Sequence, residues 1–159
     1  MPDNILVMPD DTLKVIDSTV FRTIKDDDDE PYYSSPEFRK SRTVGKPGNV
    51  WAIGVLLYNL LSGEQPFQGE DTPEVIKNIK DKKVRFDHDE FDSVSKDAKD
   101  LVELMLEKNP AKRITAEKAL DHPWFKKDDK DVNVLFHIKV MKRLKRFRQR
   151  SMLKQLTLM

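Results

Sequence analysis

The strongest constraint in this sequence is a segment at residues 50–61 that carries no charge and is apolar on almost every side of a helix. It contains Trp51, Ile53 and Val55, followed by four leucines. A helix without a polar face belongs in the interior of a domain. The segment therefore predicts a central helix around which the other elements pack, ended by Ser62 and Gly63.

Three shorter helices are predicted after the central one. Thr72-Pro73 opens the first, with Pro73 expected at the first helical position, where its missing N–H is not needed. Ser95 caps the second, whose apolar residues recur at spacings of three and four, and the Asn-Pro pair at 109–110 stops it. Thr115 caps the third, which is short.

The segment before the central helix predicts a β-hairpin and an exposed loop. Residues 4–7 and 13–16 are short apolar runs rich in β-branched residues, separated by turn-forming residues. Residues 26–30 are five consecutive acids, which repel one another and are expected to be solvated. They lack the glycine that a calcium-binding loop needs at its bend.

Composition excludes several classes of protein. The chain has no cysteine, so disulfides and thiolate metal sites are ruled out. No apolar run approaches the roughly 18 residues that a membrane span needs, and no signal peptide is visible, so we expect a cytoplasmic protein. The three histidines have no metal-ligand spacing, Trp51 and Trp124 are expected in the core, and no nucleic-acid partner is expected.

Six local stretches, in this order along the chain, resemble the C-terminal lobe of the eukaryotic Ser/Thr protein kinases. They are MPDNILV at 1–7, LKVID at 13–17, YYSSPE at 32–37, NVWAIGV at 49–55, SGEQPF at 62–67 and DHPWF at 121–125. A single match would be weak, but six in the correct order are specific. The details are most similar to the calcium/calmodulin-dependent and calcium-dependent kinases. The predicted fold is therefore mainly α: a partial kinase C-terminal lobe with a hairpin, an activation segment, a central buried helix and smaller helices.

The resemblance implies two sets of functional residues. Asn4 and Asp17 fall where the family holds Mg²⁺ and ATP, and their oxygens suit a hard cation, although a turn Asn and a strand-end Asp are the simpler reading. Glu37 and Arg113 match the buried pair that ties the activation segment to the base of the lobe. The alternative is two surface charges worth under about 1 kcal/mol.

Departures from the family pattern cluster on active-site positions. Ser18 and Thr19 stand in place of Phe and Gly, Glu30 stands in place of a loop Thr, and Asn49 replaces an Asp that holds the catalytic loop. The family's catalytic Asp would precede the first residue, and its phosphate-binding residues belong to a small lobe. The sequence thus predicts a kinase fold without catalytic activity, and with weak ATP binding at most.

Residues 132–159 carry eight basic and no acidic residues, whereas the rest of the chain carries 21 basic and 28 acidic residues. At about 100° per residue, the apolar side chains of 134–147 gather mainly on one side and the basic ones on the other. This pattern predicts a basic amphipathic helix, and residues 134–156 would bind a calmodulin-like protein or an acidic membrane surface. The anchors would be Leu144 and Phe147, with Arg143 and Arg146 supplying charge. Alternatively, the helix packs on its own acidic lobe.

The predicted organisation is a kinase lobe at 1–126, a charged linker at 127–131 and the basic helix at 132–159. Three functions remain open: a non-catalytic kinase-like chain, a genuine Ser/Thr kinase whose gene model lost its beginning, and a partner-binding module acting through the basic helix. Self-association is also expected, because the helix that partly covers the central helix in the family precedes the catalytic loop.

Overall fold

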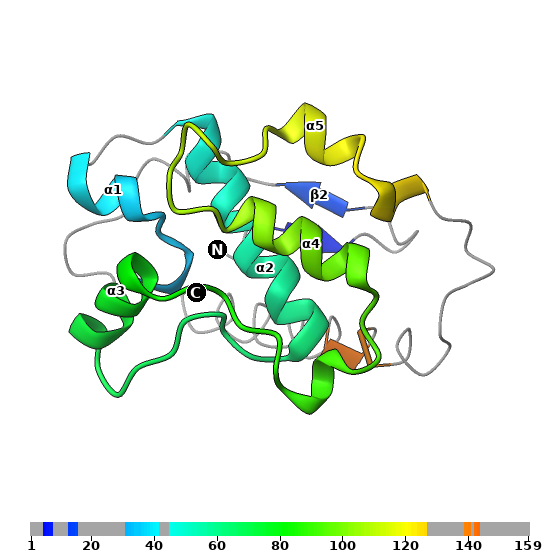
Figure 1. Ribbon diagram of the computed structural model, residues 1–159, viewed down its shortest axis with the longest axis horizontal. Coiled ribbons are helices and arrows are strands. Elements are labelled where there is room, and N and C mark those ends of the chain that lie inside the picture. Colours follow the sequence, from blue (N-terminus) through cyan, green and yellow to red (C-terminus); the bar gives the residue numbers. More distant parts are fainter. Residues whose placement is uncertain are drawn as a thin grey trace, which may run out of the picture.

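The computed structural model of the chain describes residues 5–7, 13–15, 31–41, 45–126, 139–140 and 142–143. Most of these residues are helical, as expected for this fold class (Figure 1). The elements in chain order are β1 (Ile5–Val7), β2 (Leu13–Val15), η3 (Pro31–Tyr33), α1 (Pro36–Ser41), α2 (Lys46–Ser62), α3 (Thr72–Asp81), η4 (Asp89–Phe91), α4 (Lys96–Met105), α5 (Ala116–Leu120) and η5 (Pro123–Lys126).

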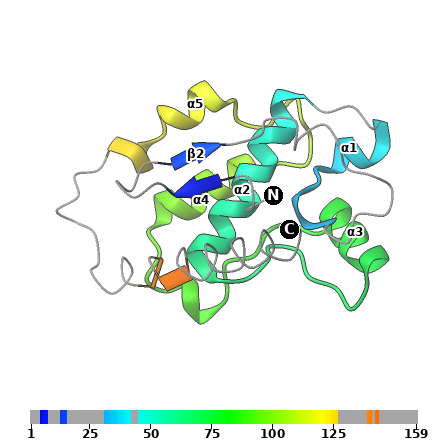
Figure 2. The same cartoon turned by 180° about the vertical axis from the view of Figure 1, so that it is seen from behind.

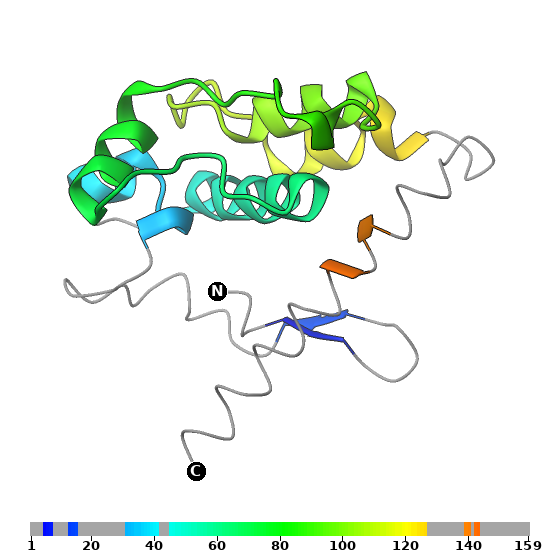
Figure 3. The same cartoon turned by 90° about the horizontal axis from the view of Figure 1, so that it is seen from below.

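The predicted hairpin is confirmed. Strands β1 and β2 pair antiparallel, with Ile5 opposite Val15 and Val7 opposite Leu13. The hairpin lies on the side of α2 that faces away from α4 (Figure 3). The acidic run at 26–30 lies outside the described residues.

Helix α2 is the central element, and it is longer than the sequence predicts. It begins at Lys46, four residues before the predicted start, because Pro47 lies in the first turn, where a missing N–H leaves no bond unmade. It ends as predicted: Gly63 adopts φ 85° and its N–H donates to the carbonyl of Asn59 at 2.7 Å. That left-handed conformation favours glycine.

The core forms around the buried side of α2. Trp51, Val55 and Tyr58 have at most 1 % of their surface exposed. Trp51 stacks on Phe67 with ring centroids 5.7 Å apart, and Tyr58 lies 4.9 Å from Phe91. Helix α4 packs directly on α2, and η3 lies against both α2 and α3 (Figure 2). These contacts place the segment at 31–37 beside the central helix.

The helix caps explain the boundaries of the shorter helices. Ser95 and Thr115 accept backbone N–H bonds at the starts of α4 and α5, as predicted. Helix α3 differs slightly, since its cap is Asp71 and Pro73 is therefore the second helical residue rather than the first. Among the described residues, no helix is long and apolar enough to cross a membrane.

Helix α2 is not enclosed on all sides, in agreement with the expectation that part of its apolar surface is left uncovered. Ile53 is 49 % exposed, and Leu57 and Leu60 are only half-buried. This side of α2 borders an open groove of about 330 Å³ lined entirely by apolar residues of α2, α4, α5 and η5. The same groove explains why Trp124, predicted in the core, is half-buried. The three shorter helices cover only part of the surface that an apolar helix presents.

The close approach of α2 and α4 depends on Gly54. A Cβ atom at this position would lie 2.8 Å from the Cβ of Met105 and 3.0 Å from Leu106 Cδ2. We expect Gly54→Ala to lower the free energy of unfolding by about 1–3 kcal/mol through overpacking, although Ala favours a helix by up to about 1 kcal/mol. Urea denaturation measures the change.

Gly48→Ala, in the first turn of the same helix, is the matched control. Its Cβ would find Ser35 Oγ at 3.4 Å, an ordinary contact, so stability is expected to stay the same or rise. Equal effects of the two substitutions would contradict the packing account.

Candidate functional site

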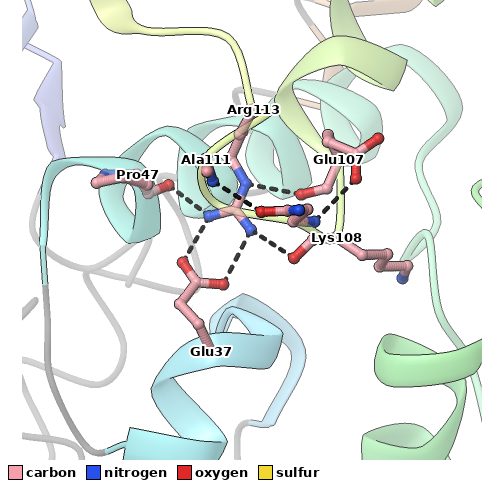
Figure 4. A network of polar contacts seen from close by, with 7 residues as sticks. Glu37, Pro47, Glu107, Lys108, Ala111 and Arg113 are labelled. Carbon is pink, nitrogen blue, oxygen red and sulfur yellow. Dashed lines mark hydrogen bonds and ion pairs between the residues drawn. The ribbon is translucent and has the colours of Figure 1, made fainter.

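Arg113 is the centre of the polar network in the described part of the chain (Figure 4). Its side chain is fully buried, and its guanidinium donates two parallel bonds to Glu37, at 2.6 Å to Oε1 and 2.9 Å to Oε2. Three further bonds reach the carbonyls of Pro47 at 2.8 Å, Glu107 at 2.8 Å and Lys108 at 3.4 Å. Since a guanidinium has five N–H donors, this buried cation is completely satisfied.

Local structure places both members of the pair. Glu37 lies in the first turn of α1, where a negative charge interacts favourably with the helix dipole. Arg113 follows a turn in which Asn109 accepts the N–H of Ala111 at 3.0 Å through its side chain and the N–H of Arg113 at 3.0 Å through its carbonyl. The structure thus brings together two residues that are 76 positions apart in the sequence.

Two opposing effects set the protonation of Glu37. Burial alone would raise the pKa of this carboxyl, but the hydrogen bonds and positive charge of Arg113 outweigh burial and hold the pKa below its ordinary value of 4.5. Glu37 is therefore ionised at neutral pH, and the network contains a true ion pair.

Lys108, beside Arg113, is a half-buried cation that the sequence analysis missed. Its ammonium lies 3.8 Å from the ring centroid of Phe67 and 4.9 Å from that of Trp51, and it donates to the carbonyl of Ile79 near the end of α3. Burial, together with the positive charge of Arg113, lowers the pKa of Lys108 to about 8. No sequence signal distinguishes this lysine from the many solvated ones.

Asn49 has an unsatisfied side chain in the first turn of α2. Its Oδ1 atom is buried and has no hydrogen-bond partner among the described residues. A buried acceptor without a donor is costly. The residue is one of those that depart from the kinase pattern.

The two residues predicted to hold Mg²⁺, Asn4 and Asp17, lie outside the described residues. The strands next to them are described, and the register sets Ile5 opposite Val15. Ile5 follows Asn4 directly, and Val15 lies two residues before Asp17. An amide oxygen with a carboxylate is a donor set that suits Mg²⁺. Within the described part of the chain, no group of three or more His, Asp or Glu residues could hold a metal ion.

Of the predicted partner-binding residues, only Arg143 is described; Leu144, Arg146 and Phe147 lie outside the described residues. The guanidinium of Arg143 donates to the carbonyl of Leu60 at 3.0 Å and also to the carbonyl of Leu61. This contact agrees with the alternative that the basic helix packs on its own lobe, but no local pattern in the sequence indicates which residues meet across more than 80 positions.

Comparison with known proteins settles the family. The profile of the protein kinase domain matches residues 1–125. The chain belongs to the protein kinase family. Glu37 and Arg113, whose pairing anchors α1, both lie within the matched kinase region.

Curated relatives of this kinase chain are calcium-regulated enzymes by name. It is 34 % identical to calcium-dependent protein kinase 25 of Arabidopsis thaliana over 99 % of its own length, and that match covers 32 % of the relative. It is 42 % identical to the type II calcium/calmodulin-dependent protein kinase subunit delta of Oryctolagus cuniculus over 78 % of the chain and 23 % of the relative. The chain thus spans a third or less of the length of these relatives.

Solved kinase structures share the fold. The autoinhibited serine kinase domain of the giant muscle protein titin superposes with a TM-score of 0.71 and 31 % identity, over 89 % of this chain and 48 % of that one. The twitchin kinase region of C. elegans gives a TM-score of 0.68 over 81 % of this chain and 24 % of that one, also with 31 % identity. The helical arrangement described above is therefore that of a kinase C-terminal lobe.

The Arg113 network predicts a large and specific cost of substitution. Arg113→Met should lower the free energy of unfolding by about 3–5 kcal/mol, because it leaves the carboxylate of Glu37 and several carbonyls without their donor. The matched control is Arg85→Met, which removes the exposed Arg85–Asp87 pair, whose side chains are 74 % and 50 % exposed. That substitution should leave the unfolding curve essentially unchanged. Similar losses in both variants would refute the special role of Arg113.

The lowered pKa of Glu37 predicts a dependence of stability on pH. As the pH falls below about 4.5, the unfolded chain takes up a proton before the folded chain does, so the Glu37 contribution to stability is lost with acidification. In Glu37→Gln this contribution is absent. The free energy of unfolding, measured between pH 6 and pH 3, should therefore decline less steeply in the variant than in the parent chain. Parallel pH profiles would contradict the assignment.

Proposed function

We propose that this chain is a non-catalytic protein-kinase lobe, which keeps the fold and the structural ion pair of its family without the chemistry of phosphate transfer. The observation that carries the proposal is the presence of Asn at position 49, whose buried side-chain oxygen has no hydrogen-bond partner among the described residues. The family resemblance alone would favour a Ser/Thr kinase, whereas the residues at which this chain departs from the family favour a lobe without catalytic activity.

Asn49 stands where the resemblance places an aspartate that holds the catalytic loop. A carboxylate binds backbone N–H groups through charge-assisted hydrogen bonds, which are roughly twice as strong as neutral ones. An amide has no charge and brings two N–H donors to a place designed for acceptors. The exchange therefore weakens the hold on the loop, and within the described part of the chain no donor reaches Asn49 Oδ1, which supports this reading.

Three further departures in the sequence support the same conclusion. Ser18 cannot fill the hydrophobic gap that the family's Phe fills, and the β-branched Thr19 resists backbone angles that Gly tolerates. Glu30 adds a negative charge where the family has a Thr that contacts the catalytic Asp. By contrast, Glu37 and Arg113 keep every bond of the structural pair. Catalysis is lost while the scaffold is retained.

ATP and Mg²⁺ are the cofactors of the family, and in this chain Asn4 and Asp17 would hold the cation, which neutralises phosphate charge when bound. We expect the affinity of the chain for nucleotide to be low, because the catalytic loop is held less firmly and the segment after Asp17 is altered. The chain would then act by presenting the surface of a kinase lobe to other molecules.

The test combines phosphate transfer with nucleotide binding. The full chain is incubated with radiolabelled Mg·ATP and a mixed peptide library, and its melting temperature is measured with and without millimolar Mg·ATP. We expect no transfer that depends on Asp17 and no rise in melting temperature, because stabilisation by a ligand requires a concentration above its dissociation constant. Transfer that Asp17→Ala abolishes would establish the alternative, an active Ser/Thr kinase, and a dissociation constant in the low micromolar range would also overturn the proposal.

A further inference from the structure

The exposed apolar side chains of the lobe gather in one place. Among the described residues, the large apolar side chains that are exposed are Ile53, Leu104, Leu120 and Phe125. All of them except Leu104 line the apolar groove beside α2. A concentration of exposed apolar side chains on one face of a domain marks an interaction surface.

One wall of the groove, formed by α5 and η5, projects beyond it as a ridge. Leu120 is 71 % exposed and Phe125 is 53 % exposed although both line the groove, so much of each side chain lies outside it. The buried His122 ties the ridge to α4, because its Nε2 atom lies 3.1 Å from Asp100 Oδ2. Its Nδ1 atom accepts the backbone N–H of Trp124 at 3.2 Å. These bonds fix the backbone of the ridge before a partner binds, which reduces the conformational entropy lost on association.

The chemistry of the groove restricts what can occupy it. An extended peptide would bring backbone N–H and C=O groups against a lining of apolar side chains, and burying such groups unpaired is costly. A small apolar ligand would fill the groove but leave the outer surface of the ridge exposed. An occupant that covers both is a protein surface whose backbone groups are bonded internally, as they are in a helix. The ridge of a second copy is such a surface, since α5 and η5 are both helical.

The charges on the ridge are compatible with a second copy. The exposed charged residues of α5, η5 and the turn between them are Glu117, Lys118, Asp121 and Lys126, two of each sign. Two ridges that approach each other therefore do not repel. In a two-fold arrangement, the acids of one copy can face the lysines of the other at the rim of the interface.

We infer that the groove is a self-association site, in which the ridge of each copy covers the groove of the other around a two-fold axis. The sequence predicts self-association without indicating a surface for it. Groove and ridge adjoin on one face, so the same surface serves both copies, as a closed two-fold interface requires. A patch of roughly a few hundred Å² on each copy is at the low end for a specific interface, so we expect a dissociation constant in the micromolar range. The inference does not depend on whether the chain transfers phosphate.

Sedimentation velocity of the full chain, followed from low to high micromolar concentration, should show monomer passing into dimer. Leu120→Lys should raise the dissociation constant at least about tenfold, because it puts a charge into the apolar interface on both copies. Leu120 is so exposed that the lobe should stay folded, which the urea midpoint verifies. The matched control is Leu104→Lys, which adds the same charge at an exposed leucine of α4 outside the groove and should change the constant by less than about threefold.

Salt distinguishes this interface from one that is driven by charge. Apolar association should persist or strengthen as sodium sulfate is added. Binding of the basic segment 132–159 to the acidic lobe of another copy would instead weaken, because salt screens exposed charges.

Because the chain contains no cysteine, single introduced cysteines locate the interface independently. Lys118→Cys lies on the ridge, whereas the control Lys83→Cys follows α3, and α3 and α5 lie at opposite ends of the lobe (Figure 1). The cross-linker is a bismaleimide that spans about 15 Å, the length of the groove along α2 from Leu60 to Val50 at 1.5 Å per residue. The ridge cysteine should give covalent dimer at least about tenfold faster than the control, since association raises the effective concentration.

Five results would each overturn the inference. These are a monomer at every concentration, growth beyond the dimer, equal effects of the two lysine substitutions, dissociation of the dimer in sulfate, and equal rates of linking by the two cysteines.

Discussion

The buried guanidinium of Arg113 is the interaction on which the rest of this lobe depends. It is bonded to the side chain of Glu37 in α1, to the first turn of α2 through Pro47, and to the turn that follows α4 through Glu107 and Lys108. A buried cation is tolerated only where its charge is compensated and its donors are all used. This requirement makes the three segments mutually dependent, because displacing any of them leaves a buried polar group unpaired.

The stacked pair Trp51 and Phe67 extends this arrangement into the core. Arg113 lies 5.1 Å above Trp51, and Lys108 lies over both rings, so two cations share one aromatic surface. Burial and the positive charge of Arg113 lower the pKa of Lys108 to about 8, while the carboxylates of Asp81 and Glu107 act in the opposite direction. The base of the lobe is therefore held by charge and aromatic contacts as much as by aliphatic packing.

Helix α2 has two unequal sides. One side packs so closely on α4 that only glycine fits at position 54, while the other borders the open groove. Charged side chains engage both ends of the helix: Arg113 through Pro47 and Arg143 through Leu60 and Leu61. These contacts tie both ends of the helix to neighbouring segments and so maintain the fold.

The sequence by itself determined the kinase family, the hairpin, the caps at Ser95 and Thr115 and the end of α2 at Gly63, because each depends on local backbone chemistry or on motifs in a fixed order. The pairing of Glu37 with Arg113 was inferred from resemblance, and only the fold shows that Arg113 makes two bonds to Glu37 and three more to backbone carbonyls. Tertiary structure decided four other features: the start of α2 at Lys46, the exposure of Ile53, the packing of Lys108 on aromatic rings and the contact of Arg143 with α2. Apolar periodicity indicates which residues are shielded from water. It does not indicate which neighbours cover them or which cations lie beside them, because those neighbours come from segments far away in the chain.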